Sequence, residues 1–444
     1  MTTAEVPATH TPIEVSGSRR SPWLFVPTLY FMQGLPYMIA TYMSGVMYKK
    51  LGISNEMIAL WTSMLIWAWT AKPLWGPIVD SNFTKRGWVV ATQGLLILGF
   101  AAVAAAIHLP NFFPVTIALF FVVAFLSATH DIACDGYYLL ALNKQQQAFF
   151  VGIRSTAFRG AMIFVQGSLI WVAGYYEELK FGQGIVWTRT MIGAVIVYGL
   201  LWLYGLVALP KPTEDVSGGV RKEGEGIPFA KALVTFFQQP RIGAILAFIL
   251  LYRCGESMVF TMAKLFLIDE RSAGGVALPT KTFAFMNGTI GVAALIVGGI
   301  AGGMMISKLG LKRCLWPMVA CMHLPILLYV WAAFARPGLT ALYAVVAVDN
   351  LGYGFGLAAY LVYLMVVSQR GIYKTSHYAV ATGIMALGAM SAGAASGYIQ
   401  KAVGYNWFFV CAFMLTIPGT LTLLFIPLDK DNAQVMGTSK QREK

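Results

Sequence analysis

The chain has 444 residues, a length that in soluble proteins is typical of two or three domains. Hydrophobic residues make up 58% of it and charged residues only 11%, whereas soluble domains carry about 25% charged residues. This composition excludes a soluble enzyme, and the recurrence of apolar runs of about 20 residues predicts a multi-pass membrane protein. The net charge of +13 indicates basic loops facing an anionic membrane surface rather than a nucleic-acid partner.

The apolar runs, taken in chain order, predict an all-α membrane protein with twelve transmembrane helices. The first 21 residues lack the short apolar core of a signal peptide, so we expect the first run to be retained as a helix. The predicted helices are 23–47, 56–79, 88–108, 113–139, 147–174, 185–208, 242–267, 282–307, 314–334, 339–367, 376–400 and 405–427.

A polar stretch between the sixth and seventh runs divides the chain into two halves. When both termini are placed in the cytoplasm, the loops on that side hold more than twice as many Lys and Arg residues as the opposite loops, which satisfies the positive-inside rule. We therefore predict a cytoplasmic N-terminal tail (1–22), a six-helix half (23–210), a cytoplasmic linker (211–240), a second six-helix half (241–428) and a cytoplasmic tail (429–444).

The two halves carry related signals after their second helices. Residues 76–80 read Gly-Pro-Ile-Val-Asp and precede a basic loop, and residues 303–313 repeat the glycine and the basic loop. The second copy has Ser307 where the first has Asp80, so only the first keeps an ionisable side chain. Six plus six helices with this repeat resemble the major facilitator superfamily, a resemblance that implies its fold.

Ionisable side chains at bilayer depth are energetically costly and indicate a transport pathway by default. Five acids and five bases stand at such positions or at a helix end, and this balance predicts ion pairing. At 100° per residue, Arg253, Glu256 and Lys264 share one stripe of their helix, and Arg159 shares a face with Gln166. The ten residues are Lys72, Asp80, Asp131, Asp135, Arg154, Arg159, Arg253, Glu256, Lys264 and Asp349.

Depth in the membrane separates these residues by expected role. A carboxylate removed from water can hold a proton at neutral pH, so Glu256 and Asp349 are proton-coupling candidates. Arginine at the midplane suits a carboxylate or phosphate on a substrate. The substrate-binding candidates are Arg159, Arg253, Lys72, Gln33, Gln166, Asn350 and Lys264, and the predicted gate or structural charges are Asp80, Asp131, Asp135 and Arg154. The scattered Cys and His residues predict no metal site.

Several stretches resemble the muropeptide-permease (AmpG-type) branch of the major facilitator superfamily, which is related to acetyl-CoA transporters. Residues 127–135 are similar to the branch's Ser-Ala-Thr-Gln-Asp-Ile-x-x-Asp, with His130 in place of Gln. Residues 72–80 are similar to Lys-x-Leu-Trp-Ser-Pro-x-x-Asp, residues 252–256 parallel Tyr-Lys-x-Gly-Asp, and Asp349-Asn350 parallels a Glu-Asn pair.

The resemblance implies a proton-driven importer of peptidoglycan fragments in the inner membrane, with a small-molecule substrate and no enzymatic activity. It implies no cofactor beyond the proton gradient, and a chain that works as a monomer in the lipid bilayer. Residues 33–37 also look like siderophore permeases, so a siderophore or acetyl-CoA-type permease stays an alternative. Two further alternatives are a transporter-like receptor without flux and a membrane-embedded transferase that uses Asp131 and Asp135 to hold a metal ion. The transferase would need further acids at fixed spacing.

Overall fold

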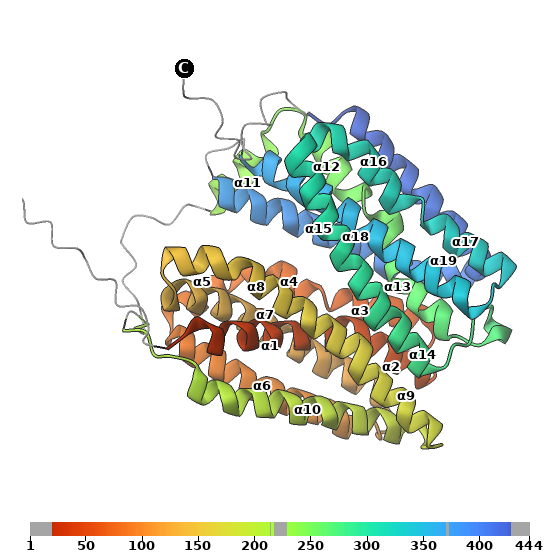
Figure 1. Cartoon of the computed structure of the whole chain (residues 1–444), viewed down its shortest axis with the longest axis horizontal. Coiled ribbons are helices and arrows are strands. Elements are labelled where there is room, and N and C mark those ends of the chain that lie inside the picture. Colours follow the sequence, from red (N-terminus) through yellow and green to blue (C-terminus); the bar gives the residue numbers. More distant parts are fainter. Residues whose placement is uncertain (1–19, 214, 217–228, 370–372, 428–444) are drawn as a thin grey trace, which may run out of the picture.

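The computed structural model describes residues 20–213, 215–216, 229–369 and 373–427. Over these ranges the regular secondary structure is helical throughout, and the helices form two bundles that lie side by side (Figure 1). The first bundle runs from α1 to α10 and the second from α11 to α19, and we call them the N-terminal and C-terminal halves. Most of the two predicted tails, and linker residues 214 and 217–228, lie outside the described residues.

Prolines interrupt the first two helices of the N-terminal half. Pro36 lies inside α1, which passes into the π-helical turn η2, because a proline removes one backbone hydrogen bond and clashes with the preceding turn. Pro73 and Pro77 divide the second predicted helix into short pieces. The elements of this half are η1 (Pro22–Leu24), α1 (Val26–Met38), η2 (Ile39–Met43), α2 (Ser44–Lys50), α3 (Asn55–Met64), α4 (Trp67–Ala71), η3 (Lys72–Leu74), α5 (Gly76–Ser81), α6 (Lys85–Ala106), α7 (Phe112–Ala141), α8 (Lys144–Ile163), η4 (Phe164–Leu169), α9 (Ile170–Glu178) and α10 (Gln183–Ala208).

The C-terminal half begins with a short helix, α11, inside the stretch that the sequence predicts as linker. Its last element, α19, is one run of 48 residues that turns at Gly404, where φ is 73°, a value that glycine adopts without strain. The elements are α11 (Phe229–Phe237), α12 (Ile242–Leu251), α13 (Cys254–Ile268), η5 (Arg271–Ala273), α14 (Thr280–Ala284), η6 (Phe285–Gly291), α15 (Val292–Leu309), α16 (Leu311–His323), α17 (Ile326–Ala335), α18 (Leu339–Gln369), α19 (Lys374–Leu421) and η7 (Thr422–Leu424).

Nine helical runs in the described part of the chain are long and apolar enough to cross a membrane. The first two predicted helices are missing from this set because they are broken into short pieces, and the last two are joined in α19. The prediction of an all-helical membrane fold is therefore confirmed. The count of twelve spans and the cytoplasmic position of the termini stay predictions.

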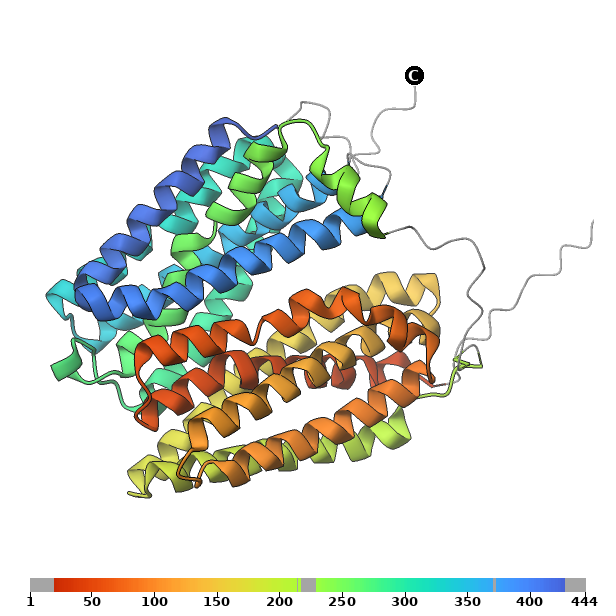
Figure 2. The same cartoon turned by 180° about the vertical axis from the view of Figure 1, so that it is seen from behind.

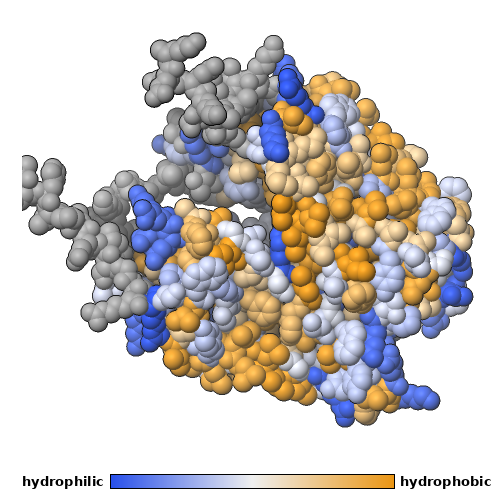
Figure 3. Space-filling view, viewed as in Figure 1, coloured by the Kyte–Doolittle hydropathy of each residue, from blue (hydrophilic) through white to orange (hydrophobic). Residues whose placement is uncertain are grey.

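The two halves meet at one end of the molecule and diverge toward the other (Figure 2). The end where they diverge holds η1, the end of α10 and α11, and we call it the linker end; the opposite end is the distal end. Near the distal end α3 packs on α19 and α9 packs on α14. Apolar side chains cover much of the outer surface (Figure 3), as expected for helices that face lipid.

Glycines allow two close backbone approaches. Gly167 of η4 and Gly288 of η6 bring the backbones of the two halves together, with no space for a Cβ atom on Gly288. Within the C-terminal half, Gly298 packs against the carbonyl oxygen of Leu351, so that α15 and α18 lie in close contact.

We expect Gly298→Ala to destabilise the C-terminal half, because the added methyl group would overlap the backbone of α18. Overpacking of this kind typically costs about 1–3 kcal/mol. Gly303→Ala in the same helix is the matched control, since no atom lies within 4 Å of the added methyl group there. Thermal unfolding of the purified protein in detergent should give a lower melting temperature for Gly298→Ala than for Gly303→Ala, and equal values would contradict the packing argument.

Candidate functional site

A cavity of about 710 Å³ lies between the two halves, a volume typical of small-molecule sites. Its walls come from α1, η2, α8 and η4 of the N-terminal half and from α13, α15, α18 and α19 of the C-terminal half, among others. Nine of the predicted site residues line it: Gln33, Arg154, Arg159, Gln166, Arg253, Glu256, Lys264, Asp349 and Asn350. Lys72, Asp80, Asp131 and Asp135 are not among the lining residues.

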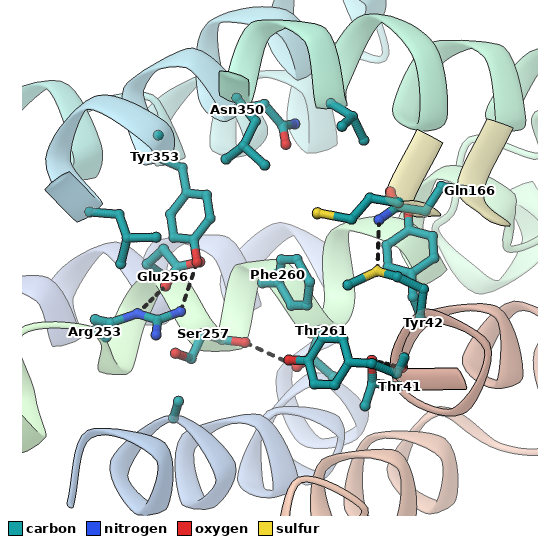
Figure 4. A pocket seen from close by; sticks show the side chains of 18 of the residues that line it. Thr41, Tyr42, Gln166, Arg253, Glu256, Ser257, Phe260, Thr261, Asn350 and Tyr353 are labelled. Atoms are coloured by element: carbon teal, nitrogen blue, oxygen red, sulfur yellow. Dashed lines mark hydrogen bonds and ion pairs between the residues drawn. The ribbon is translucent and has the colours of Figure 1, made fainter. Parts of the chain in front are cut away.

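One wall of the cavity carries a charge cluster at a helix break. Arg253 stands between the end of α12 and the start of α13, and Glu256 lies in the first turn of α13, where the helix dipole favours an acid. The Arg253 Nε atom lies 3.2 Å from Glu256 Oε2, and its Nη2 atom donates to the Tyr353 hydroxyl at 3.0 Å (Figure 4). The charge of the buried Glu256 is therefore matched by a base of the same helix.

Three charged side chains of the cavity have no salt bridge within the part of the chain that the structure describes: Arg159, Lys264 and Asp349. Arg159 extends across the cavity toward α15, and its Nη2 atom lies 3.6 Å from the position of a Cβ on Gly299. Asp349 lies within electrostatic range of Glu256, which has the same charge sign. Lys264 is buried, and Arg159 and Asp349 are partly buried. Because an uncompensated charge removed from water is costly, these three groups are suited to binding an ion or a proton.

The predicted gate charges pair within the N-terminal half. Lys72 forms a salt bridge with Asp131, which also accepts a hydrogen bond from Gln33. Arg154 Nη2 lies 3.1 Å from Asp135 Oδ1.

The fourth predicted gate charge, Asp80, pairs with Lys85, also within the N-terminal half. Because both partners of each pair belong to the N-terminal half, these pairs do not join the two halves in this conformation. Their role as a gate between the halves stays a prediction.

At the distal end, polar side chains that the sequence did not single out join the two halves. Asp269 forms a salt bridge with Lys49 at 2.8 Å and accepts hydrogen bonds from Asn55 and from the Tyr405 hydroxyl. Asn55 also donates to Gln400 at 3.0 Å. These contacts connect the end of α2 and the start of α3 with the C-terminal half, and they close the distal end.

Two further ion pairs join the halves at this end. Glu56 pairs with Lys401 at 2.6 Å and Glu178 with Lys281 at 2.6 Å. These pairs are more exposed than the contacts of Asp269.

Aromatic side chains that no sequence pattern assigned to the site form much of the remaining cavity wall. They include Tyr37, Tyr42, Phe158, Phe260, Tyr329 and Tyr353. Tyr353 could have been found, because it follows Asp349 by four residues and so shares its helix face. Aromatic rings provide flat apolar surface for a sugar ring or a similar group.

No group of three or more potential metal ligands of the His, Cys, Asp or Glu type is present among the described residues. Asp131 and Asp135, the acids that a transferase would need, each contact a base. Their surroundings therefore favour ion pairing over metal binding.

Comparison with known proteins identifies relatives that match most of the chain. Residues 28–376 match the family model for the Major Facilitator Superfamily. An anhydromuropeptide permease of Escherichia coli is 26% identical over 406 residues, which cover 89% of this chain and 78% of the relative. The predicted resemblance to the muropeptide-permease branch is thereby confirmed.

Solved structures share the fold. A bacterial homologue of the human lysosomal transporter Spinster gives a TM-score of 0.68 at 15% identity, over 90% of this chain and 95% of that one. A D-xylose–proton symporter gives a TM-score of 0.66 at 11% identity, over 91% of this chain and 97% of that one. At these identities the similarity concerns the arrangement of helices alone.

Proposed function

Because this chain belongs to the major facilitator superfamily, whose members are transporters rather than enzymes, we propose that it imports a small anionic amino sugar or muropeptide across the inner membrane. The energy source in this proposal is the proton gradient, and the path is alternating access between the two halves. The observation that carries the proposal is the cavity between the halves, which combines unpaired charges with aromatic walls. Similarity to a permease for anhydromuropeptides supports the class of substrate.

The charge of the cavity supports an anionic substrate. Its lining includes the bases Arg154, Arg159, Arg253 and Lys264, against the acids Glu256 and Asp349. Two of these bases, Arg159 and Lys264, lack an acidic partner in the described part of the chain. An anion that enters the cavity would supply the missing negative charge.

The surroundings of the two candidate acids favour Asp349 as the proton carrier. Glu256 is held by Arg253, which stabilises its charged form. Asp349 has no such base, and its charged neighbour is the acid Glu256. A proton on Asp349 would remove the repulsion between the two carboxylates.

The direction of transport in the proposal combines the predicted topology with the observed conformation. If the termini are cytoplasmic, as the positive-inside rule predicts, then the linker end faces the cytoplasm. The halves diverge at that end and contact one another at the distal end, as expected for an inward-open state (Figure 2).

The test is uptake into proteoliposomes with an imposed pH gradient, using a labelled anhydro-muropeptide. We expect accumulation that requires the gradient and that excess unlabelled muropeptide abolishes. Competition by a ferric siderophore or by acetyl-CoA in its place would favour the alternative permeases. Binding without flux would indicate a receptor, and gradient-independent turnover of a lipid substrate with Mg²⁺ would indicate a transferase.

We expect Arg159→Gln to weaken binding of the anionic substrate by about 10- to 100-fold, because a hydrogen bond to a charged group contributes about 1.5–3 kcal/mol. Binding to the purified protein can be measured by calorimetry. Arg189→Gln is the matched control, since Arg189 packs on Phe181 and is not among the cavity-lining residues. Equal affinity of Arg159→Gln and wild type would remove Arg159 from the binding site.

A further inference from the structure

We propose that Lys264 forms a second anion-binding subsite at the distal part of the cavity, and that the substrate is an elongated molecule whose terminal carboxylate binds there. This inference rests on the proposed function, since it specifies which part of the substrate lies where. It specifies the length of the substrate and its orientation in the cavity.

Lys264 lies on α13, away from the charge cluster of Arg253 and Glu256. It follows Glu256 by eight residues, which places it about 12 Å farther along the helix axis toward the distal end. Phe260 lies between the Arg253–Glu256 pair and Tyr42 (Figure 4). The ammonium group therefore belongs to a different part of the cavity from the charge cluster at the helix break.

The ammonium group of Lys264 lies in buried surroundings between the two halves. Lys264 is only 4% exposed, and the structure shows no acid paired with it in the part of the chain it describes. Its Nζ atom lies 3.5 Å from the Thr41 carbonyl oxygen and 4.9 Å from the centroid of the Tyr42 ring. An ammonium group has three N–H donors, and the single long contact to the Thr41 carbonyl oxygen uses at most one of them. A buried cation in this condition is suited to an incoming anion.

Lys264 and its neighbours also limit the chemistry of the ligand. Lysine is a compact point charge that binds a single carboxylate without the two-point geometry that arginine imposes. The rings of Tyr42 and Phe260 flank Nζ, so the part of the ligand next to its acid must fit between aromatic walls. Gly45 lies beside Nζ, where a larger side chain would meet it.

Both halves contribute residues to the surroundings of Lys264. Lys264 belongs to the C-terminal half, whereas Thr41 and Tyr42 belong to the N-terminal half. A carboxylate at Lys264 would therefore contact a site built from both halves and would compete with the Thr41 carbonyl. An amino sugar extended by a short acidic peptide has both the length and the terminal carboxylate that this arrangement requires.

The test compares two ligands that differ only at the terminal acid: a muropeptide with free peptide carboxylates and the same compound with those groups amidated. We expect wild-type protein to bind the acid at least tenfold more tightly than the amide. Lys264→Gln should bind both with the affinity that wild type has for the amide, and Lys264→Arg should keep part of the preference. Lys308→Gln, an exposed lysine outside the cavity lining, is the matched control.

The outcomes separate this inference from the proposed function. Binding of both ligands by wild type without preference for the acid overturns the subsite and leaves the proposed function intact. A preference that survives in Lys264→Gln also overturns the subsite, whereas unchanged binding of the amide by that variant shows that it is folded. Failure of wild type to bind either ligand overturns the proposed function and the subsite with it.

Discussion

Asp349→Asn is expected to abolish proton-driven accumulation of substrate while leaving exchange of substrate across the membrane. Asparagine resembles the protonated carboxyl group in size, so binding and the movement of the two halves should continue without a proton. For one proton per substrate, each unit of pH difference supports about tenfold accumulation. Accumulation by the variant should therefore fall to a concentration ratio near one in proteoliposomes that carry a pH gradient.

Two controls make this experiment specific. Asp349→Glu keeps an ionisable group and should retain part of the accumulation. Glu256→Gln removes the acid that Arg253 already neutralises, and it should strengthen binding of an anionic substrate through the freed arginine more than it affects coupling. Full accumulation by Asp349→Asn together with its loss in Glu256→Gln would transfer the coupling role to Glu256.

Asp269→Asn is expected to open the distal end. Removing one partner of a buried salt bridge costs about 3–5 kcal/mol, and Asp269 holds Lys49 together with two further donors. The population of the distal-closed state should fall by at least tenfold. Spin labels can report the change at Gly182→Cys and Gly338→Cys, two distal positions where no atom lies within 4 Å of an added Cβ.

Glu178→Gln is the control for this measurement. It also breaks an ion pair between the halves, with Lys281, but Glu178 is more than half exposed, and exposed pairs contribute about 0–1 kcal/mol. We expect the spin-label distances to lengthen in Asp269→Asn and to stay near wild type in Glu178→Gln. The same distances in both variants would show that Asp269 does not hold the distal end closed.

Local periodicity explains what the sequence could predict of the cavity. Arg253, Glu256 and Lys264 share a stripe because helix geometry depends on neighbours in the chain, and all three line the cavity. The break between α12 and α13 was not predicted, because the hydrophobic pattern continues through it. That break sets Arg253 at a helix start rather than in a continuous helix.

Contacts between distant segments could not be predicted in the same way. The balance of acids and bases indicated pairing, but it did not identify Asp131 as the partner of Lys72, 59 residues away. Asn55 contacts Asp269 and Gln400 across 214 and 345 positions. Such contacts depend on how the two halves pack, and no pattern within one helix reports that packing.

The contact between Gly167 and Gly288 has a mechanical consequence. Because the contact is between two backbones, no side-chain rotation can loosen it. It can therefore be the point about which the two halves rotate relative to each other. Gly288 lies eight residues from the distal start of the run Thr280–Leu309 and 21 from its other end, which gives arms of about 12 Å and 32 Å. A rotation about this point would therefore move the linker end about two and a half times as far as the distal end. Separation of the distal polar contacts by a few ångströms would then accompany a larger closing movement at the linker end.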